Sequence, residues 1–124
     1  MRSLVVQVRL IIEKFAISRI IDDVSAEDLS RLKSVLSKLR QACEEGSEEA
    51  LRQYDLEFHR TLIEFNHDKE LINLWQPFVN RMMLHYGRHS DLIESYKEHL
   101  AIFEAIANHD LQAAMQGLEM NLRY

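Results

Sequence analysis

Four polar side chains of kinds that bind ions or polar ligands fall on the apolar faces of predicted helices. Asp55 and His59 are four residues apart, so one helical turn places both on the same face. His99 and Asn121 follow further along the chain. Imidazole and carboxylate groups suit Zn²⁺, Ni²⁺ or Mn²⁺, and three such ligands leave coordination positions open. Asn is a poor ligand for Zn²⁺, but it can bind a harder ion or orient a water.

A second interpretation needs no ion. Asp55 and His99 could form one buried ion pair, with His59 and Asn121 hydrogen-bonded beside it, because buried polar groups must find partners. Residue types and spacing leave the two interpretations open.

The helical period supports burial of each of the four. At about 100° per residue, the neighbours of Asp55, His99 and Asn121 on their own faces are apolar or small. These neighbours are Leu51, Phe58 and Leu62 in the first case, Leu92, Tyr96, Ile102, Phe103 and Ile106 in the second, and Ala114, Gly117 and Leu118 in the third.

Arg9 is a further candidate for ligand binding. Glu13 follows one turn later, so the pair could be a surface ion pair of a few tenths of a kcal/mol. The alternative is that the Arg9 guanidinium binds a carboxylate within a pocket.

Six helices with short connections are expected to position these residues. The ends of these helices are predicted from capping residues and helix breakers. Ser25 with Asp28 forms a capping box, and Ser47 and Asp110 are further N-caps. Pro77 predicts a kink within its helix. The expected helices run from about Leu4 to Ile21, from Ser25 to the break at Gly46, from Ser47 to about Phe65, from the turn at 66–68 to Gly87, from Ser90 or Asp91 onward, and from Asp110 to the end. In the first helix the expected inward side chains are Leu4, Val5, Val8, Ile12, Phe15 and Ile20.

Composition indicates one all-α domain over residues 1–124. The chain is 47% apolar and 28% charged, with three Gly and one Pro, which favours long helices around a single core. The net charge of −5 with scattered basic residues gives no electrostatic footprint for nucleic acid. The apolar run at residues 4–8 is too short for a signal peptide or membrane helix. The single Cys43 is compatible with a reducing compartment, so we expect a cytoplasmic protein.

The order of several of these residues resembles a known family, the C-terminal effector domain of GntR-type transcription regulators, in the FadR-like subgroup whose module is called FCD. The resemblance covers nearly the whole chain and rests on order and spacing rather than on one motif. The residues that carry it are Val8-Arg9 with Glu13, the run 55–59 (Asp-Leu-Glu-Phe-His), Asn66, Leu71, Glu98-His99, Ile106, Asp110, and Ala113 or Ala114.

The resemblance implies an antiparallel helical bundle whose central cavity binds a small organic acid beside a divalent metal. It assigns Asp55, His59 and His99 as metal ligands, with Asn121 where the family usually has His. Arg9 matches an arginine that often faces the cavity, so Arg9 and Asn121 are the expected effector-binding residues. The family binds operator DNA as a dimer through an N-terminal winged helix-turn-helix, which we do not find here. We therefore expect a homodimer that binds no nucleic acid by itself.

The leading hypothesis is a ligand-sensing regulatory domain that is not an enzyme. A metal-dependent enzyme is the first alternative, because an ion with open positions can activate water. No Glu, Asp or His besides the ligands is expected inward as a general base, which argues against it. The second alternative is a metal-free helical dimerisation bundle.

Overall fold

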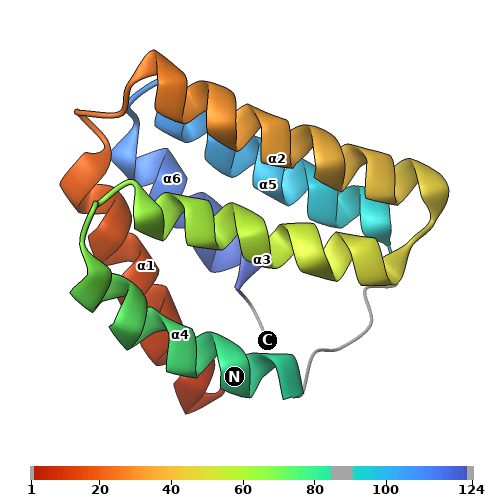
Figure 1. Cartoon of the computed structure of the whole chain (residues 1–124), viewed down its shortest axis with the longest axis horizontal. Coiled ribbons are helices and arrows are strands. Elements are labelled where there is room, and N and C mark those ends of the chain that lie inside the picture. The colour runs from red at the N-terminus through yellow and green to blue at the C-terminus, as the bar shows by residue number, and fades with distance from the viewer. Residues whose placement is uncertain (1, 85–90, 123–124) are drawn as a thin grey trace.

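The computed structural model describes residues 2–84 and 91–122, and within these ranges it is built from six helices (Figure 1). They are α1 (Leu4–Ile20), α2 (Ala26–Glu45), α3 (Glu48–Glu64), α4 (Lys69–Leu84), α5 (Leu92–Ala107) and α6 (Leu111–Asn121). The predicted all-α class is confirmed. None of the described helices combines the length and hydropathy needed for a membrane span.

Local side-chain caps explain where the helices begin. Ser25 accepts a hydrogen bond from the Asp28 backbone N–H, and the Asp28 carboxylate accepts one from the Ser25 N–H, so the predicted capping box is confirmed. Ser47, Asp91 and Asp110 cap α3, α5 and α6 in the predicted manner. Pro77 lies inside α4 as expected. Two further expectations, Gly87 as the end of α4 and Ser90 as the alternative start of α5, fall outside the described residues.

Helix α3 lies at the centre of the packing. It contacts α1, α2, α4 and α5, while α5 pairs with α6 and α2, and α1 pairs with α4 (Figure 1). The main apolar core is shared by α1, α2, α3, α5 and α6. A smaller core lies between α1, α3 and α4, around Trp75. Because both cores adjoin α3, side chains on its inner face are surrounded by protein.

The inward side of helix α1 matches the expected one only in part, since Ile20 is buried as expected. Leu4 and Phe15 are 73% and 53% exposed, whereas the buried face carries Arg9 and Glu13. Apolar residues occur nearly all around this helix, so their period does not select a face. The buried side of α1 combines the polar contacts of Arg9 and Glu13, described below, with apolar residues such as Leu10 and Ile17. The helical period also predicts an inward position for Leu74 of α4, next to Leu71 and Trp75, but Leu74 is 55% exposed, so that prediction is wrong.

Helix α6 approaches α5 closely at Gly117, as the small residues on its inner face suggested. A Cβ atom added to Gly117 would lie 2.9 Å from Cγ1 of Ile102, and Ile102 is fully buried. The missing side chain at position 117 is therefore what permits this helix-to-helix distance.

We predict that Gly117→Ala destabilises the protein. The gain in helix propensity is about 1 kcal/mol, but the added methyl collides with buried Ile102 and overpacking costs about 1–3 kcal/mol. Urea unfolding should show a lower midpoint for this variant. Gln116→Ala, at an exposed neighbouring position, should change stability by less than about 0.5 kcal/mol. A higher midpoint for Gly117→Ala would contradict the close approach.

Candidate functional site

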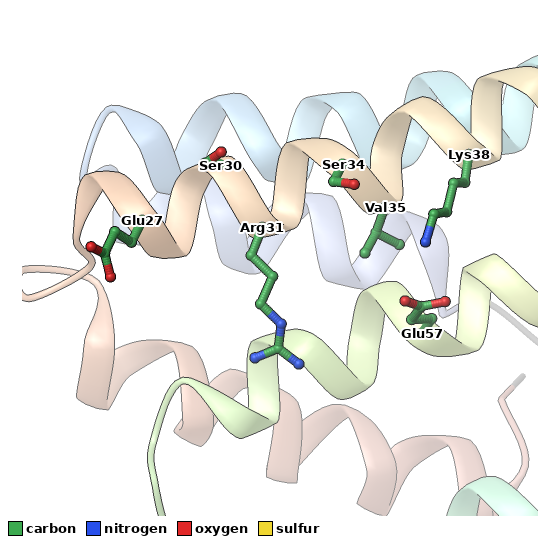
Figure 2. A pocket seen from close by; sticks show the side chains of 7 residues that line it. All are labelled: Glu27, Ser30, Arg31, Ser34, Val35, Lys38 and Glu57. Carbon is green, nitrogen blue, oxygen red and sulfur yellow. The ribbon is translucent and has the colours of Figure 1, made fainter.

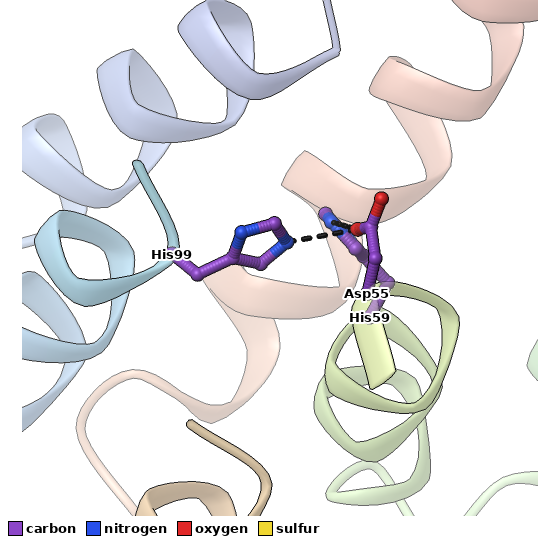
Figure 3. Close-up of side chains that lie close together, drawn as sticks. All are labelled: Asp55, His59 and His99. Carbon is purple, nitrogen blue, oxygen red and sulfur yellow. Dashed lines mark hydrogen bonds and ion pairs between the residues drawn. The ribbon is translucent and has the colours of Figure 1, made fainter. Parts of the chain in front are cut away.

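Asp55, His59 and His99 lie together on the inner faces of α3 and α5 (Figure 3). One ligand atom from each can be chosen so that all three lie within 4.8 Å of one another. The Nε2 atom of His99 is 2.8 Å from Oδ1 of Asp55, and Nε2 of His59 is 3.3 Å from the same oxygen. The structure thus brings together three residues that the sequence placed on separate turns.

Both imidazole rings are held firmly from outside the cluster. His59 and His99 are fully buried, and Phe58 packs edge-on against both rings. Nδ1 of His99 donates to the backbone carbonyl of Ser95 at 2.7 Å. A carbonyl can only accept, so Nδ1 carries the proton and Nε2 is the atom that faces Asp55.

Glu13 of α1 orients His59. Its Oε1 accepts from Nδ1 of His59 at 2.5 Å, and its Oε2 accepts from Nε of Arg9 at 2.6 Å and Nε1 of Trp75 at 2.9 Å. A carboxylate that holds the outer nitrogen of a histidine fixes the ring and directs its other nitrogen inward, as around many metal sites.

Asn121 completes the cluster from the last turn of α6. Its Oδ1 lies 2.7 Å from Nε2 of His59, and its Nδ2 donates to Oε1 of Glu98 at 3.0 Å. Because Glu98 offers only an acceptor when ionised, the amide must turn its oxygen toward His59. Glu98 is therefore the residue that determines which Asn121 atom enters the site.

The ionised forms of Glu13, His59 and Asp55 stabilise one another. Burial opposes ionisation of Glu13, but Arg9 and His59 outweigh it and lower the pKa of Glu13 to about 2. Burial also opposes charge on His59, yet the carboxylates of Glu13 and Asp55 raise the pKa of His59 to about 9. Burial is likewise overcome at Asp55, whose pKa is held well below its usual value by His99 and His59.

The donor set fits a divalent ion after a small contraction. Bonds of about 2.0–2.2 Å in a tetrahedral arrangement place ligand atoms about 3.4 Å apart. The 3.3 Å separation of His59 Nε2 and Asp55 Oδ1 already matches this value. The widest separation among the three ligand atoms, which is at most 4.8 Å, must shorten by on the order of 1 Å. Two neutral imidazoles and a carboxylate form an ordinary ligand set for Zn²⁺, Ni²⁺ or Mn²⁺.

Arg9 is buried, so its interpretation as a surface ion pair is wrong. Only 6% of the residue is exposed, and besides Glu13 its guanidinium reaches Sδ of Met82 at 3.2 Å. Its expected role in effector binding stays a prediction.

The expectation that no other acid points inward is also wrong, since Glu13 and Glu98 are 1% and 7% exposed. The i,i+4 spacing of Arg9 and Glu13 was the one sequence feature that could have predicted the inward position of Glu13. No pattern in the sequence predicts the burial of Glu98.

One buried polar atom beside the cluster has no partner in the described part of the chain. Ser95 lies one turn before His99 and is 1% exposed, and its Oγ makes no hydrogen bond. Leaving such a group unsatisfied costs about 1–3 kcal/mol.

Residues of the described ranges line two surface hollows away from the cluster. A groove of about 500 Å³ between α2 and α3 is lined by Arg31, Lys38 and Glu57, among others, and shares no residue with the cluster (Figure 2). A second groove, of about 650 Å³, is lined by residues at the α5–α6 side that include Glu98. Through Glu98 and Asn121 this second groove is linked to His59 by consecutive hydrogen bonds.

The fold and the buried cluster define an all-α domain with a polar group of side chains at its centre, and comparison with known proteins identifies its family. The sequence profile described as "FCD domain" matches residues 4–123, so this chain belongs to the FCD domain family. The predicted resemblance to the effector domains of GntR-type regulators is thereby confirmed.

Three relatives are informative. The chain is 28% identical over 116 residues to an uncharacterized HTH-type transcriptional regulator, YdhC of Bacillus subtilis strain 168, covering 89% of this chain and 51% of that protein. It thus spans about half the length of this curated relative. McbR/YncC of E. coli superposes with a TM-score of 0.85 at 18% identity, over 96% of this chain and 59% of the other. The metal-free FCD domain of TM0439 superposes with a TM-score of 0.81 at 19% identity, over 96% and 84% of the two chains. These two structures share the fold.

The His59 network predicts how stability depends on pH in chelator-treated protein. The pKa of His59 rises from 6.5 to about 9 on folding, so its stabilisation is complete below pH 6.5 and lost as the pH rises through 9. The free energy of unfolding should fall by about 3 kcal/mol across this window. Glu13 has the opposite effect at acid pH. Its pKa falls from 4.5 to about 2 on folding, so its contribution to stability is complete above pH 4.5 and is lost as the pH falls through 2.

Denaturant unfolding at a series of pH values measures both effects. His59→Gln keeps a polar side chain but cannot titrate, so the decline between pH 6.5 and 9 should shrink in this variant. Equal alkaline declines in the two proteins would show that His59 is not the group responsible.

Proposed function

We propose that this chain is the ligand-sensing domain of a transcription regulator and that it binds a divalent metal through Asp55, His59 and His99. The observation that carries the proposal is the convergence of these three donors within 4.8 Å inside an FCD domain. When bound, the ion would supply a positive charge that fixes a small organic acid by one of its carboxylate oxygens. The unpartnered Ser95 hydroxyl beside His99 supports a polar occupant nearby.

The residues of this chain prepare the site in distinct ways. Glu13 and the Ser95 carbonyl hold the outer nitrogens of His59 and His99, so the Nε2 atoms point at Asp55. To bind an ion, His59 must release the Nε2 proton that faces Asn121. We propose that Asn121 then offers its oxygen to the ion or to a bound water. With oxygen in place of a fourth nitrogen, Mn²⁺ or Ni²⁺ suits the site better than Zn²⁺.

A complete regulator would need a DNA-binding domain in addition to this one. The curated relative is an HTH-type regulator about twice as long as this chain. We propose that DNA binding belongs to such a domain, that the FCD domain forms a homodimer in the cytoplasm, and that effector binding shifts the population between two dimer arrangements. Sensing is preferred over catalysis, because Glu13, the acid nearest to His59, already accepts from three donors.

Metal binding should stabilise the folded domain. With Mn²⁺, Ni²⁺ or Zn²⁺ at 100 times its dissociation constant, chelator-treated protein should gain about 2.7 kcal/mol. For a domain of this size the melting temperature should rise by on the order of 8–14 °C. His99→Ala should remove most of the shift, and Asn121→His should enlarge it by adding a nitrogen ligand. Differential scanning calorimetry with and without each ion measures the effect.

A surface histidine provides the control. His67 lies in the exposed turn before α4, so His67→Ala should retain the wild-type shift. Identical melting of wild-type protein with and without all three ions would leave only the buried ion-pair interpretation.

Arg9 tests the effector part of the proposal. In metal-loaded protein, calorimetric titration with a panel of small mono- and dicarboxylates should identify binders. Arg9→Ala should weaken their binding by about 1.5–3 kcal/mol, the range for hydrogen bonds to charged groups. Arg9→Lys keeps the charge beside Glu13 but loses the guanidinium fork, so it should show an intermediate loss. Unchanged dissociation constants in both variants would limit Arg9 to its structural pairing with Glu13.

A further inference from the structure

Glu98 is a buried carboxylate that directly precedes His99 on α5 but points to a different helix. Successive residues of a helix point about 100° apart. His99 reaches Asp55 of α3. Glu98 instead reaches Asn121 of α6. Only 7% of Glu98 is exposed, where it lines the groove at the α5–α6 side, so this carboxylate lies between the surface and the cluster.

The close packing of α5 on α6 sets the contact between Glu98 and Asn121. Gly117 lies one turn before Asn121, and Ile102, which fills the space beside Gly117, lies one turn after Glu98. Two contacts one turn apart, in opposite chain directions on the two helices, are what antiparallel packing gives. The pairing of Glu98 with Asn121 is therefore part of the register of these helices.

Each end of the Asn121 amide has its own partner in the described structure. Oδ1 lies 2.7 Å from Nε2 of His59, and Nδ2 donates to Oε1 of Glu98 at 3.0 Å. An amide turned by 180° would set two donors against each other at His59 and two acceptors against each other at Glu98. In the metal-free protein both neighbours therefore select the same orientation.

Binding of an ion would leave this selection to Glu98. A histidine nitrogen that binds a metal has no proton to donate, so Nε2 of His59 would no longer distinguish the two ends of the amide. Glu98 would still accept from Nδ2, and the amide oxygen would stay directed at the ion. Glu98 thus acts on Asn121 as Glu13 acts on His59, each carboxylate holding an outer nitrogen from another helix.

We propose that Glu98 is a positioning residue that makes Asn121 an oxygen ligand, and that it thereby shifts the metal preference of the site toward Mn²⁺. This inference rests on the proposed function, because it concerns the ion that Asp55, His59 and His99 would bind. Mn²⁺ favours oxygen ligands in octahedral sites, whereas three protein ligands and a water satisfy Zn²⁺. Loss of the fourth protein oxygen should weaken binding of Mn²⁺ more than binding of Zn²⁺.

Calorimetric titration of the chelator-treated full chain with Mn²⁺ and with Zn²⁺ tests this role. Glu98→Met removes the acceptor but keeps a long side chain, so the dissociation constant for Mn²⁺ should rise by roughly tenfold or more. The constant for Zn²⁺ should rise by less than about threefold. Glu98→Leu removes the acceptor with a second apolar side chain and should behave alike. Glu98→Gln keeps an acceptor oxygen without the charge, so the ratio of the two constants should stay within about threefold of wild type.

Two further variants separate this effect from a general change in charge or packing. Glu94 is exposed and lines the same groove. Glu94→Met removes the same charge but leaves the acceptor of Asn121 in place, so both constants should be unchanged. Asn121→Ala removes the oxygen itself and should change the ratio as Glu98→Met does. The effects of Glu98→Met and Asn121→Ala should not add in the double variant, because Glu98 acts through Asn121.

A measurement without metal distinguishes failure of this inference from failure of the proposed function. In nuclear magnetic resonance of the metal-free protein, the side-chain amide protons of Asn121 should exchange slowly in wild type and Glu98→Gln, and faster in Glu98→Met. Equal exchange in all three, or a ratio of constants that Glu98→Met leaves unchanged, would overturn the role of Glu98 and leave the metal site standing. Wild-type protein that binds neither Mn²⁺ nor Zn²⁺ would overturn both.

Discussion

The carboxylate of Glu13 is the interaction on which the arrangement of this domain depends. It accepts from Arg9 of its own helix, from His59 of α3 and from Trp75 of α4. Three helices are thereby joined at one buried anion, and removing it would take the acceptor away from Nε of Arg9, Nδ1 of His59 and Nε1 of Trp75. A buried charge that loses its partner costs about 3–5 kcal/mol. The same carboxylate sets the ring orientation of His59, so folding and the geometry of the candidate metal site share one group.

The Glu13 carboxylate also explains which inward-facing residues can be predicted from the sequence and which cannot. Asp55, His59 and His99 each lie among apolar residues on strongly one-sided helices, so the helical period alone predicts that they point inward. Helix α1 is apolar nearly all around, and its inward face is chosen by polar pairing with residues of α3 and α4. Such pairing is a long-range property that periodicity does not contain. Glu98 was missed for a related reason, because its burial depends on the approach of Asn121 from α6.

Asn121 stands where the family resemblance implies a histidine, and in the proposed site this difference affects more than the choice of ligand. An imidazole in that position could donate or accept according to its protonation state, whereas the amide has a fixed donor and a fixed acceptor. Glu98 takes the donor, and the acceptor is left for His59. The metal-free cluster is therefore internally paired, with a proton on His59 where an ion would bring its own charge. In the proposed function, binding of a metal would exchange these charges within an existing framework of side chains.

The absence of a side chain at Gly117 has a mechanical consequence. With Ile102 filling the space that a Cβ would need, α6 packs against α5 at a distance that a larger residue at position 117 would not allow. The α5–α6 pair carries His99 and Asn121, while α3 carries Asp55 and His59. The proposed site therefore joins two closely packed helices to a third, and an ion that drew the donor atoms together would pull on the α5–α6 pair through two of its side chains.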